Sequence, residues 1–287
     1  MKSVSEWLYR PAAISHNSVG MERGYTHPLM RPILFLPGLR SKPFYDVNDF
    51  AWVKTLEASF EEIRNELKAC AAPGGGGFQG YIVPEDIGKG VVSVPNWRTL
   101  FFVSPQGKKF EDNIARCPKT WEVMNSIPGF VTSSMTMFSS LNPGGRIQPH
   151  AGLTNGCLRV HLGVVVPEPA QAIIRVGDEV RTWEEGKVMI FNDAFDHEVW
   201  HNGSSTRSVL FFDVWHPDLT KEDLAIIEPA WGAIKATSGQ LADDYEKMAR
   251  VEQAKTKNEE PNWFVEKREL KQAPVSTPPI SRAPSGL

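Results

Sequence analysis

Histidine is concentrated in one part of this chain. Five of its seven histidines lie between Ser139 and His216, among short apolar runs. Imidazole nitrogens are good ligands for divalent transition metals, and one frequent arrangement combines two histidines with one carboxylate, in the sequence form His-x-Asp or His-x-Glu followed by a distal histidine. Here His150-Ala151-Gly152 is the proximal element and His197 the distal candidate. Gly152 has no side chain, so the carboxylate of this pattern is missing.

Strand-like runs separated by turn signals surround these histidines. Gly177-Asp178, Glu185-Gly186 and Asn202-Gly203 suit the positive φ values of tight hairpins. Short strands at such even spacing predict an antiparallel sandwich or jelly roll, whose interior can hold a small ligand. The predicted strands cover residues 158–166, 172–176, 179–183, 187–191 and 207–214.

Longer motifs add a family resemblance. The segments HAGLTNGCLRVHLGVVVP, RTWEEGKVMIFNDAFDHEVW and SSTRSVLFFDVWHPDLT resemble the catalytic domain of aspartyl/asparaginyl β-hydroxylases, and FLPGLRSKPFYD and ARCPKTWEVMNSIPGF are similar too. The resemblance covers roughly residues 32–220. It implies a mainly β fold with flanking helices, a double-stranded β-helix of the jelly-roll, cupin-like type. It also implies a dioxygenase that uses iron(II), 2-oxoglutarate and O2.

The resemblance assigns roles to individual residues. His150 and His197 are the expected iron ligands, because enzymes of this family bind iron with two histidines and leave water in the remaining position. Asp193 is the expected catalytic carboxylate that holds this water, although an Asp in FNDAFDH also suits a turn. A buried carboxylate of 2-oxoglutarate needs a paired cation. The residues expected to contact the co-substrate are Ser139, Arg159, His161 and Arg207.

Strand periodicity makes further predictions. Arg159 and His161 alternate with apolar residues, so they share one strand face, which should line the cavity. By the same period Arg146 and Gln148 share the face of His150. We therefore expect Arg146, Gln148 and Arg159 to contact the substrate.

Two other histidines are expected to lie outside the chemistry. His201 falls in the loop HNGSS and should be exposed to solvent, and His216 precedes a proline at a strand end and should be structural. Two positions that are basic in the animal enzymes are apolar here, as Met137 and Leu158. This difference favours a small, less polar substrate over an acidic peptide.

Composition limits the partners and the location. A net charge of −3 and a pI near 6.2 give no basic field for nucleic acid or an anionic membrane. No apolar stretch has the length of a signal peptide core or a membrane span. The three cysteines are too scattered for a disulfide framework. We expect a cytoplasmic protein with a small-molecule substrate.

The chain divides into four segments. Residues 1–31 should be irregular, 32–220 form the oxygenase domain, 221–271 a C-terminal helical extension and 272–287 a disordered tail rich in proline. Asn48 and Asp49 are expected to cap a helix over about residues 50–71. A second helix over 239–257 carries a thin apolar stripe that docks on the body or forms a homodimer.

Three functions stay open. The first is a soluble oxygenase that hydroxylates a small, amino-acid-derived or natural-product substrate. The second is a hydroxylase of Asp or Asn residues in a cytosolic protein, and the third is a metal-free jelly-roll binding module. An open ligand position at Gly152 could also hold a halide and direct chlorination, but the nearby Asp193 disfavours an anion there.

Overall fold

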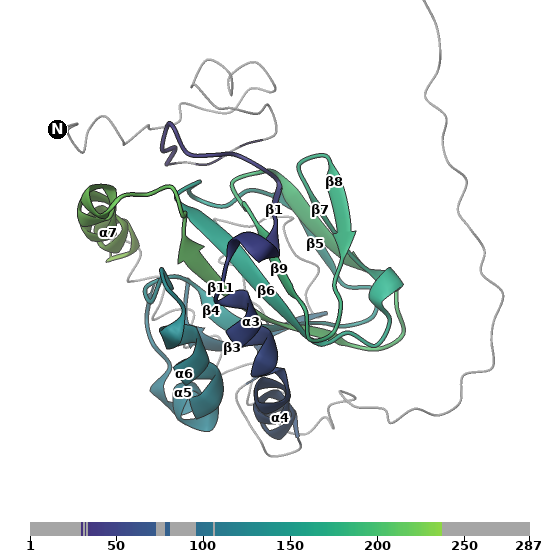
Figure 1. Ribbon diagram of the computed structural model, residues 1–287. Helices are drawn as coiled ribbons and strands as arrows, with labels where there is room; N and C mark the ends of the chain where they lie inside the picture. Colours follow the sequence, from purple (N-terminus) through teal and green to yellow (C-terminus); the bar gives the residue numbers. More distant parts are fainter. Residues whose placement is uncertain are drawn as a thin grey trace, which may run out of the picture.

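Two antiparallel sheets pack face to face in the computed structural model (Figure 1), which describes Met30, Pro32 and residues 34–72, 78–80, 96–105 and 107–236. Apolar side chains from both sheets form the core between them, among them Met137 and Phe211 from one sheet and Ile174 and Val199 from the other. This arrangement confirms the expected jelly roll with flanking helices.

The larger sheet has seven strands in spatial order β1-β9-β6-β11-β4-β3-β2. β6 and β11 are its central pair, joined in antiparallel register with Phe211 opposite His161 and Asp213 opposite Arg159. The strand bounds, in spatial order, are Phe44–Tyr45, Val188–Phe191, Cys157–Val165, Arg207–Trp215, Thr136–Leu141, Trp97–Val103 and Gln79–Gly80.

The smaller sheet has the order β5-β10-β7-β8. Its strands are Arg146–His150, His197–His201, Ala172–Val176 and Glu179–Thr182. β5 carries a bulge against β10, because two residues of β5 lie between Ile147 and His150, whereas one residue of β10 lies between their partners Val199 and His197. The bulge decides which side chains of β5 face the cavity.

Helices cover the outer face of the larger sheet in Figure 1: η1 (Val47–Asp49), α3 (Val53–Ala58), α4 (Phe60–Ala71), α5 (Glu111–Arg116) and α6 (Pro118–Ser126). Leu56, Ile63, Leu67 and Met124 pack there against the sheet. The expected single helix over 50–71 is wrong in two respects. Asp46 caps η1, and Ser59 separates α3 from α4.

One of the three predicted hairpin turns is confirmed: Gly177-Asp178 joins the paired strands β7 and β8, whereas the other two turns connect strands of different sheets. Positive φ is confirmed at two of the three places. Gly177 and Gly186 adopt φ values of 60° and 76°, which glycine tolerates because it lacks a Cβ. Gly203 is not among the glycines with positive φ. All five predicted strands exist, with ends that differ by at most one residue, and the prediction did not include β1, β2, β3, β4 or β10.

The C-terminal part of the described chain is α7 (Lys221–Ala236), separated from the other helices at the left of Figure 1. It confirms a helical start to the extension after residue 220. The helix expected over 239–257 and the tail over 272–287 lie outside the described residues, as does nearly all of 1–31. No helix among the described residues is long and apolar enough to cross a membrane.

Candidate active site

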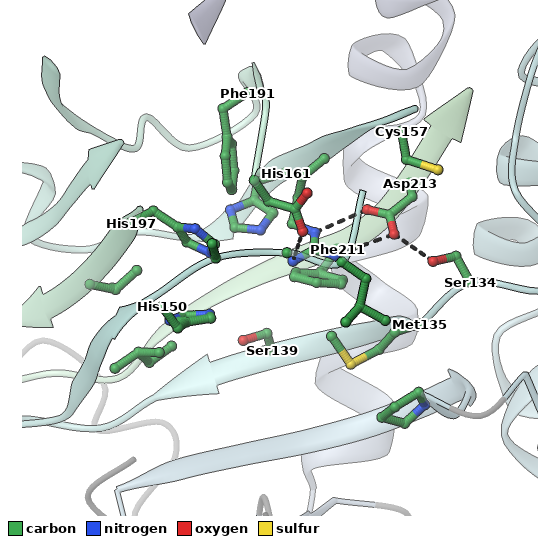
Figure 2. A pocket seen from close by; sticks show the side chains of 18 of the residues that line it. Ser134, Met135, Ser139, His150, Cys157, His161, Phe191, His197, Phe211 and Asp213 are labelled. Carbon is green, nitrogen blue, oxygen red and sulfur yellow. Dashed lines mark hydrogen bonds and ion pairs between the residues drawn. The ribbon is translucent and has the colours of Figure 1, made fainter. Parts of the chain in front are cut away.

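A cavity of about 310 Å³ lies between the two sheets. This volume is within the range of small-ligand sites, roughly 300–1,000 Å³. Figure 2 shows His150 and His197 together at the left of the cavity, and Cys157, Ser134 and Met135 at the right. The predicted site residues that line it are Ser139, His150, Arg159, His161, Asp193, His197 and Arg207.

The two candidate metal ligands come from neighbouring strands. His150 ends β5 and is paired in register with His197 at the start of β10, and their ring centroids are 4.1 Å apart. His150 Nδ1 lies 2.7 Å from the carbonyl oxygen of Gln148, and His197 Nδ1 lies 2.9 Å from that of Phe195. A ring nitrogen beside a carbonyl must donate, so both Nδ1 atoms carry the proton and both Nε2 atoms keep a lone pair.

Burial lowers the pKa of His150, and it lowers the pKa of His197 well below its usual value. Both rings are therefore neutral near pH 7, the form that binds a metal. No group of three or more His, Cys, Asp or Glu side chains within the described part of the chain could hold a metal ion. The donor set fits iron(II) held by two imidazoles with small ligands in the other positions, and it does not fit a complete two-histidine, one-carboxylate triad.

Gly152 and Asp193 are in direct contact. The Gly152 amide donates a 2.6 Å hydrogen bond to the Asp193 carbonyl oxygen. A Cβ built on Gly152 would overlap the Asp193 carboxylate, which occupies that space. Burial raises the pKa of Asp193 to about 6, although Arg159 opposes this shift.

Arg159 connects two buried carboxylates, those of Asp193 and Asp213, and Asp213 is labelled in Figure 2. Its Nη1 lies 2.8 Å from Asp193 Oδ2, and its Nε and Nη2 donate to the two oxygens of Asp213 at 3.0 and 3.3 Å. Ser134 donates to Asp213 at 2.5 Å. The guanidinium also lies 4.2 Å from the centre of the Phe211 ring. These contacts fix Arg159 and, through it, the orientation of Asp193.

Arg207 has a different environment. It is 2% exposed, and no carboxylate among the described residues forms an ion pair with it. Its carbon Cζ lies 4.2 Å from the centre of the Trp183 ring, and its Nε has no hydrogen-bond partner there. Burial without a counter-charge lowers the pKa of Arg207 to about 9. A buried cation of this kind needs an anion from outside the chain.

His161 and Ser139 add polar groups beside Arg207. Trp183 donates its indole N–H to His161 Nδ1 at 3.2 Å, so the neutral ring carries its proton on Nε2, which has no partner among the described residues. Burial lowers the pKa of His161 well below its usual value. Ser139 accepts the Trp97 indole N–H at 2.9 Å and keeps its own hydroxyl proton to donate. The cavity thus offers a cation and neutral donors, the complement of a carboxylate.

Two predicted substrate contacts do not lie in the cavity. Arg146 and Gln148 are exposed, whereas Ile147 and His150 line the cavity. Strict period two placed Arg146 and Gln148 on the face of His150, and this was wrong because the β5 bulge interrupts the alternation. Of the three predicted substrate contacts, the structure brings Arg159 alone into the cavity that holds the candidate metal ligands.

Other expectations also need correction. His201 is 1% exposed, so it is not the solvent-exposed residue that we expected, and its Nε2 lies 2.5 Å from the Ser205 carbonyl oxygen. Leu158 packs against the helices on the outer face of the sheet, so its apolar character carries no information about the substrate. His216 is buried beside Tyr45, 2.8 Å from its hydroxyl, which agrees with a structural role.

Sequence reasoning missed Asp213 and Ser134, which hold Arg159. A signal existed, because Asp213 interrupts the apolar strand SVLFFDVW, and a carboxylate within a buried strand needs a partner. No comparable signal marks three tryptophans of the site in the sequence. Trp97 and Trp183 orient Ser139 and His161, and Trp231 lines the cavity from α7.

Sequence comparisons identify the family of this chain. A model of the aspartyl/asparaginyl β-hydroxylase family matches residues 57–217, more than half of the chain. The chain belongs to this family. The β-hydroxylase match includes the two candidate metal ligands, His150 and His197. It also includes Gly152, Asp193 and Arg207. The family match therefore includes the part of the chain that forms this side of the cavity.

Two curated β-hydroxylase relatives illustrate the range of the family. The ornithine lipid ester-linked acyl 2-hydroxylase of Rhizobium tropici is 39% identical over 185 residues, 62% of this chain and 62% of that protein. The human aspartyl/asparaginyl β-hydroxylase is 34% identical over 210 residues, 71% of this chain and 27% of that protein. The chain thus spans less than two thirds of the length of either relative.

Solved structures resemble this β-hydroxylase family member only distantly. A 2OG-Fe(II) oxygenase family oxidoreductase from Burkholderia pseudomallei aligns with a TM-score of 0.31 at 12% identity, over 41% of this chain and 66% of that one. AviO1 from Streptomyces viridochromogenes Tue57 aligns with a TM-score of 0.36 at 9% identity, over 58% and 86%. The fold assignment rests on the two sheets themselves.

Proposed function

We propose that this protein is an iron(II)- and 2-oxoglutarate-dependent oxygenase that hydroxylates an unactivated C–H bond in the acyl chain of a small amphipathic molecule. The observation that carries the oxygenase part is the pairing of two neutral histidines in one cavity with Arg207, a buried cation without a carboxylate partner in the described chain. Membership of a hydroxylase family supports the same chemistry.

His150 and His197 would hold the iron through Nε2. Arg207 would pair with the distal carboxylate of 2-oxoglutarate, and Ser139 and the His161 Nε2–H would donate to the co-substrate. When bound, iron and 2-oxoglutarate together supply the oxidation, in which O2 converts the co-substrate to succinate and CO2 and one oxygen atom enters the C–H bond.

The chain itself contributes position and a dry environment. Buried aromatic rings of Phe191 and Phe211 lie beside the polar groups and exclude water. Arg159 holds the Asp193 carboxylate beside Gly152, where it can accept a proton from a small ligand in the open position. A carboxylate there also repels a halide, which favours hydroxylation over chlorination.

Two observations support an acyl substrate. Apolar side chains line much of the cavity, including Met135, Leu153, Phe211 and Trp231. Both cations among the described lining residues also have roles already, because Arg159 is neutralised by Asp193 and Asp213, and Arg207 would bind the co-substrate. No cation in this part of the cavity is left for an acidic peptide side chain. The name of the Rhizobium tropici relative, an acyl 2-hydroxylase, supports the same substrate class.

Anaerobic reconstitution with iron(II) tests the proposal. The wild-type protein should convert 2-oxoglutarate to succinate when O2 is admitted, and mass spectrometry of a co-incubated lipid extract should show a product heavier by one oxygen atom. The His197→Ala variant is the control and should form neither product. Absence of succinate with the wild-type protein would contradict the oxygenase assignment.

A further inference from the structure

Helix α7 contributes to the cavity although it lies beyond the family match, which ends at residue 217. Trp231 of α7 is 5% exposed and lines the cavity together with Leu153 and Cys157. Ile227 and Trp231 of α7 pack with Leu36 in one buried apolar cluster. The helix therefore forms part of the cavity wall that the common β-hydroxylase domain does not supply.

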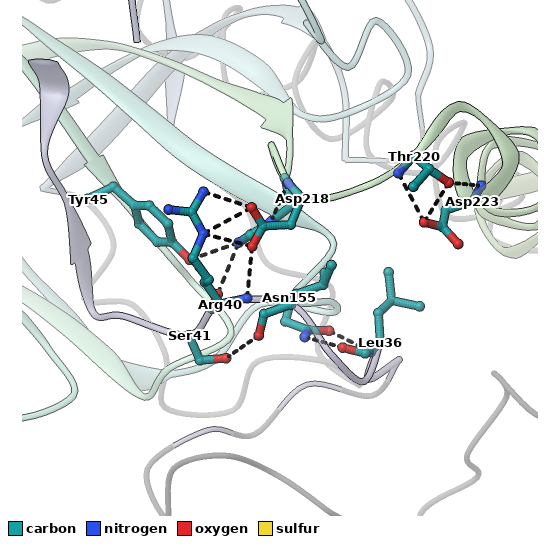
Figure 3. Close-up of polar contacts among 10 residues, drawn as sticks. Leu36, Arg40, Ser41, Tyr45, Asn155, Asp218, Thr220 and Asp223 are labelled. Carbon is teal, nitrogen blue, oxygen red and sulfur yellow. Dashed lines mark hydrogen bonds and ion pairs between the residues drawn. The ribbon is translucent and has the colours of Figure 1, made fainter. Parts of the chain in front are cut away.

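Polar contacts surround the start of α7, as Figure 3 shows. The Thr220 hydroxyl accepts the Asp223 amide at 3.1 Å, and the Asp223 carboxylate accepts the Thr220 amide at 3.0 Å, a reciprocal cap of the first turn. Just before it, Asp218 accepts three hydrogen bonds from the Arg40 guanidinium, at 2.9, 2.8 and 2.7 Å. These bonds join the residues before the helix to a loop 178 residues earlier in the sequence.

The position of Trp231 along the cavity follows from β6. Cys157, Arg159 and His161 all line the cavity from this strand, and a strand rises about 3.4 Å per residue, so Cys157 and His161 lie roughly 13 Å apart along it. Trp231 packs in the cluster that contains Cys157, whereas the His161 ring lies 5.0 Å from Phe191, which in turn lies 5.8 Å from His197. Trp231 thus lies at the end of the cavity away from the candidate iron ligands.

We propose that Trp231 is a specificity-determining residue that ends the acyl-binding part of the cavity and so sets the length of chain that the enzyme accepts. This inference rests on the proposed function. An indole ring offers a large, rigid apolar surface, and each methylene buried against such a wall changes affinity by about fourfold. A chain too long to end at Trp231 would have to displace a ring held by its own core cluster.

The test uses the full chain reconstituted with iron(II). Ornithine-containing lipids with one constant head group and ester-linked acyl chains of increasing length serve as probes, and kcat/KM is measured for each length. Trp231→Ala should move the preferred length toward longer chains and change the ratio between the longest and shortest probes by roughly tenfold or more. Trp231→Phe, which keeps an aromatic ring and the packing of α7, should give a smaller shift in the same direction.

Ile227→Ala is the matched control. Ile227 lies one turn earlier on α7 and packs in the same cluster, but it does not line the cavity. This variant should keep the wild-type length profile, because it weakens the docking of α7 without removing the wall. Calorimetric binding of the same lipid series to each variant gives the profile without turnover.

Failure of the inference and failure of the proposed function give different results. If the wild-type protein forms no succinate from 2-oxoglutarate, the proposed oxygenase function is wrong. If the wild-type protein turns over and Trp231→Ala and Trp231→Phe keep its length profile, or if Ile227→Ala shifts the profile equally, Trp231 does not determine specificity. Absence of binding to any lipid of the series would also overturn the inference.

Discussion

The carboxylate of Asp193 fills the space in which a Cβ on Gly152 would have to lie. In a two-histidine, one-carboxylate site the residue two positions after the proximal histidine supplies a carboxylate. In this protein Asp193, from a different loop, places its carboxylate where the Cβ of residue 152 would lie, and Arg159 holds it there at 2.8 Å. The missing side chain at Gly152 is therefore a requirement of the site.

Substitution of Gly152 tests this relationship. Gly152→Ala must displace Asp193 and separate it from Arg159, and breaking a buried ion pair typically costs about 3–5 kcal/mol of folding free energy. Urea unfolding of Gly152→Ala, Asp193→Gly and the double variant forms a cycle in which the double variant should lose less stability than the sum of the single variants. Additive losses would show that the two residues do not compete for space.

Replacement of the candidate metal ligands should remove iron. His150→Ala and His197→Ala each take away one of two imidazole ligands, so iron content after anaerobic reconstitution should fall to background for both variants. His216→Ala provides the comparison, because His216 contacts Tyr45 and Arg40 outside the cavity. It should bind iron normally once folded. Full iron content in His197→Ala would rule out this pair of ligands.

Arg207 should lower the free energy of unfolding of the protein without co-substrate, and it should be needed for binding 2-oxoglutarate. Arg207→Met removes a buried charge without a carboxylate partner in the described chain and should raise the free energy of unfolding by about 1–4 kcal/mol. The same variant should bind 2-oxoglutarate roughly 30-fold more weakly or worse, since truncation of a buried charge pair costs about 2–5 kcal/mol. Calorimetry measures both quantities.

Two further variants sharpen the test of Arg207. Arg207→Lys should have intermediate affinity, because an ammonium cannot reproduce the forked contact of a guanidinium. Arg175→Ala should leave affinity unchanged, because Arg175 pairs with Asp196 and Glu198 away from the cavity. Normal 2-oxoglutarate binding by Arg207→Met would place the anion anchor elsewhere.

Acid should weaken the attachment of α7. The hydrogen bonds from Arg40 lower the pKa of Asp218 from 3.8 to about 2. A depressed acid pKa contributes stability that is complete above the unfolded value and is lost as the pH falls through the folded value. The stability difference between wild type and Asp218→Asn should therefore be constant above about pH 4 and shrink toward pH 2. It should also be small and decrease with salt, because both side chains are partly exposed.

Local sequence determined the kind of structure and most of the predicted site. Alternating apolar residues and glycine turns predicted the strands, because period two and positive φ are properties of a few neighbouring residues. The motifs around His150 and His197 predicted the family, which the match over residues 57–217 confirms. The roles of Ser139, Asp193 and Arg207 stay predictions, although their side chains do line one cavity.

Tertiary structure decided what depends on partners far apart in the chain. The β5 bulge, which moves Arg146 and Gln148 out of the cavity, exists only in the register between β5 and β10. Asp213 holds Arg159 because strand pairing places the two residues opposite each other. Trp231 lines the cavity because α7 packs against residues near the start of the described chain. Such contacts are set by global packing, which no local periodicity encodes.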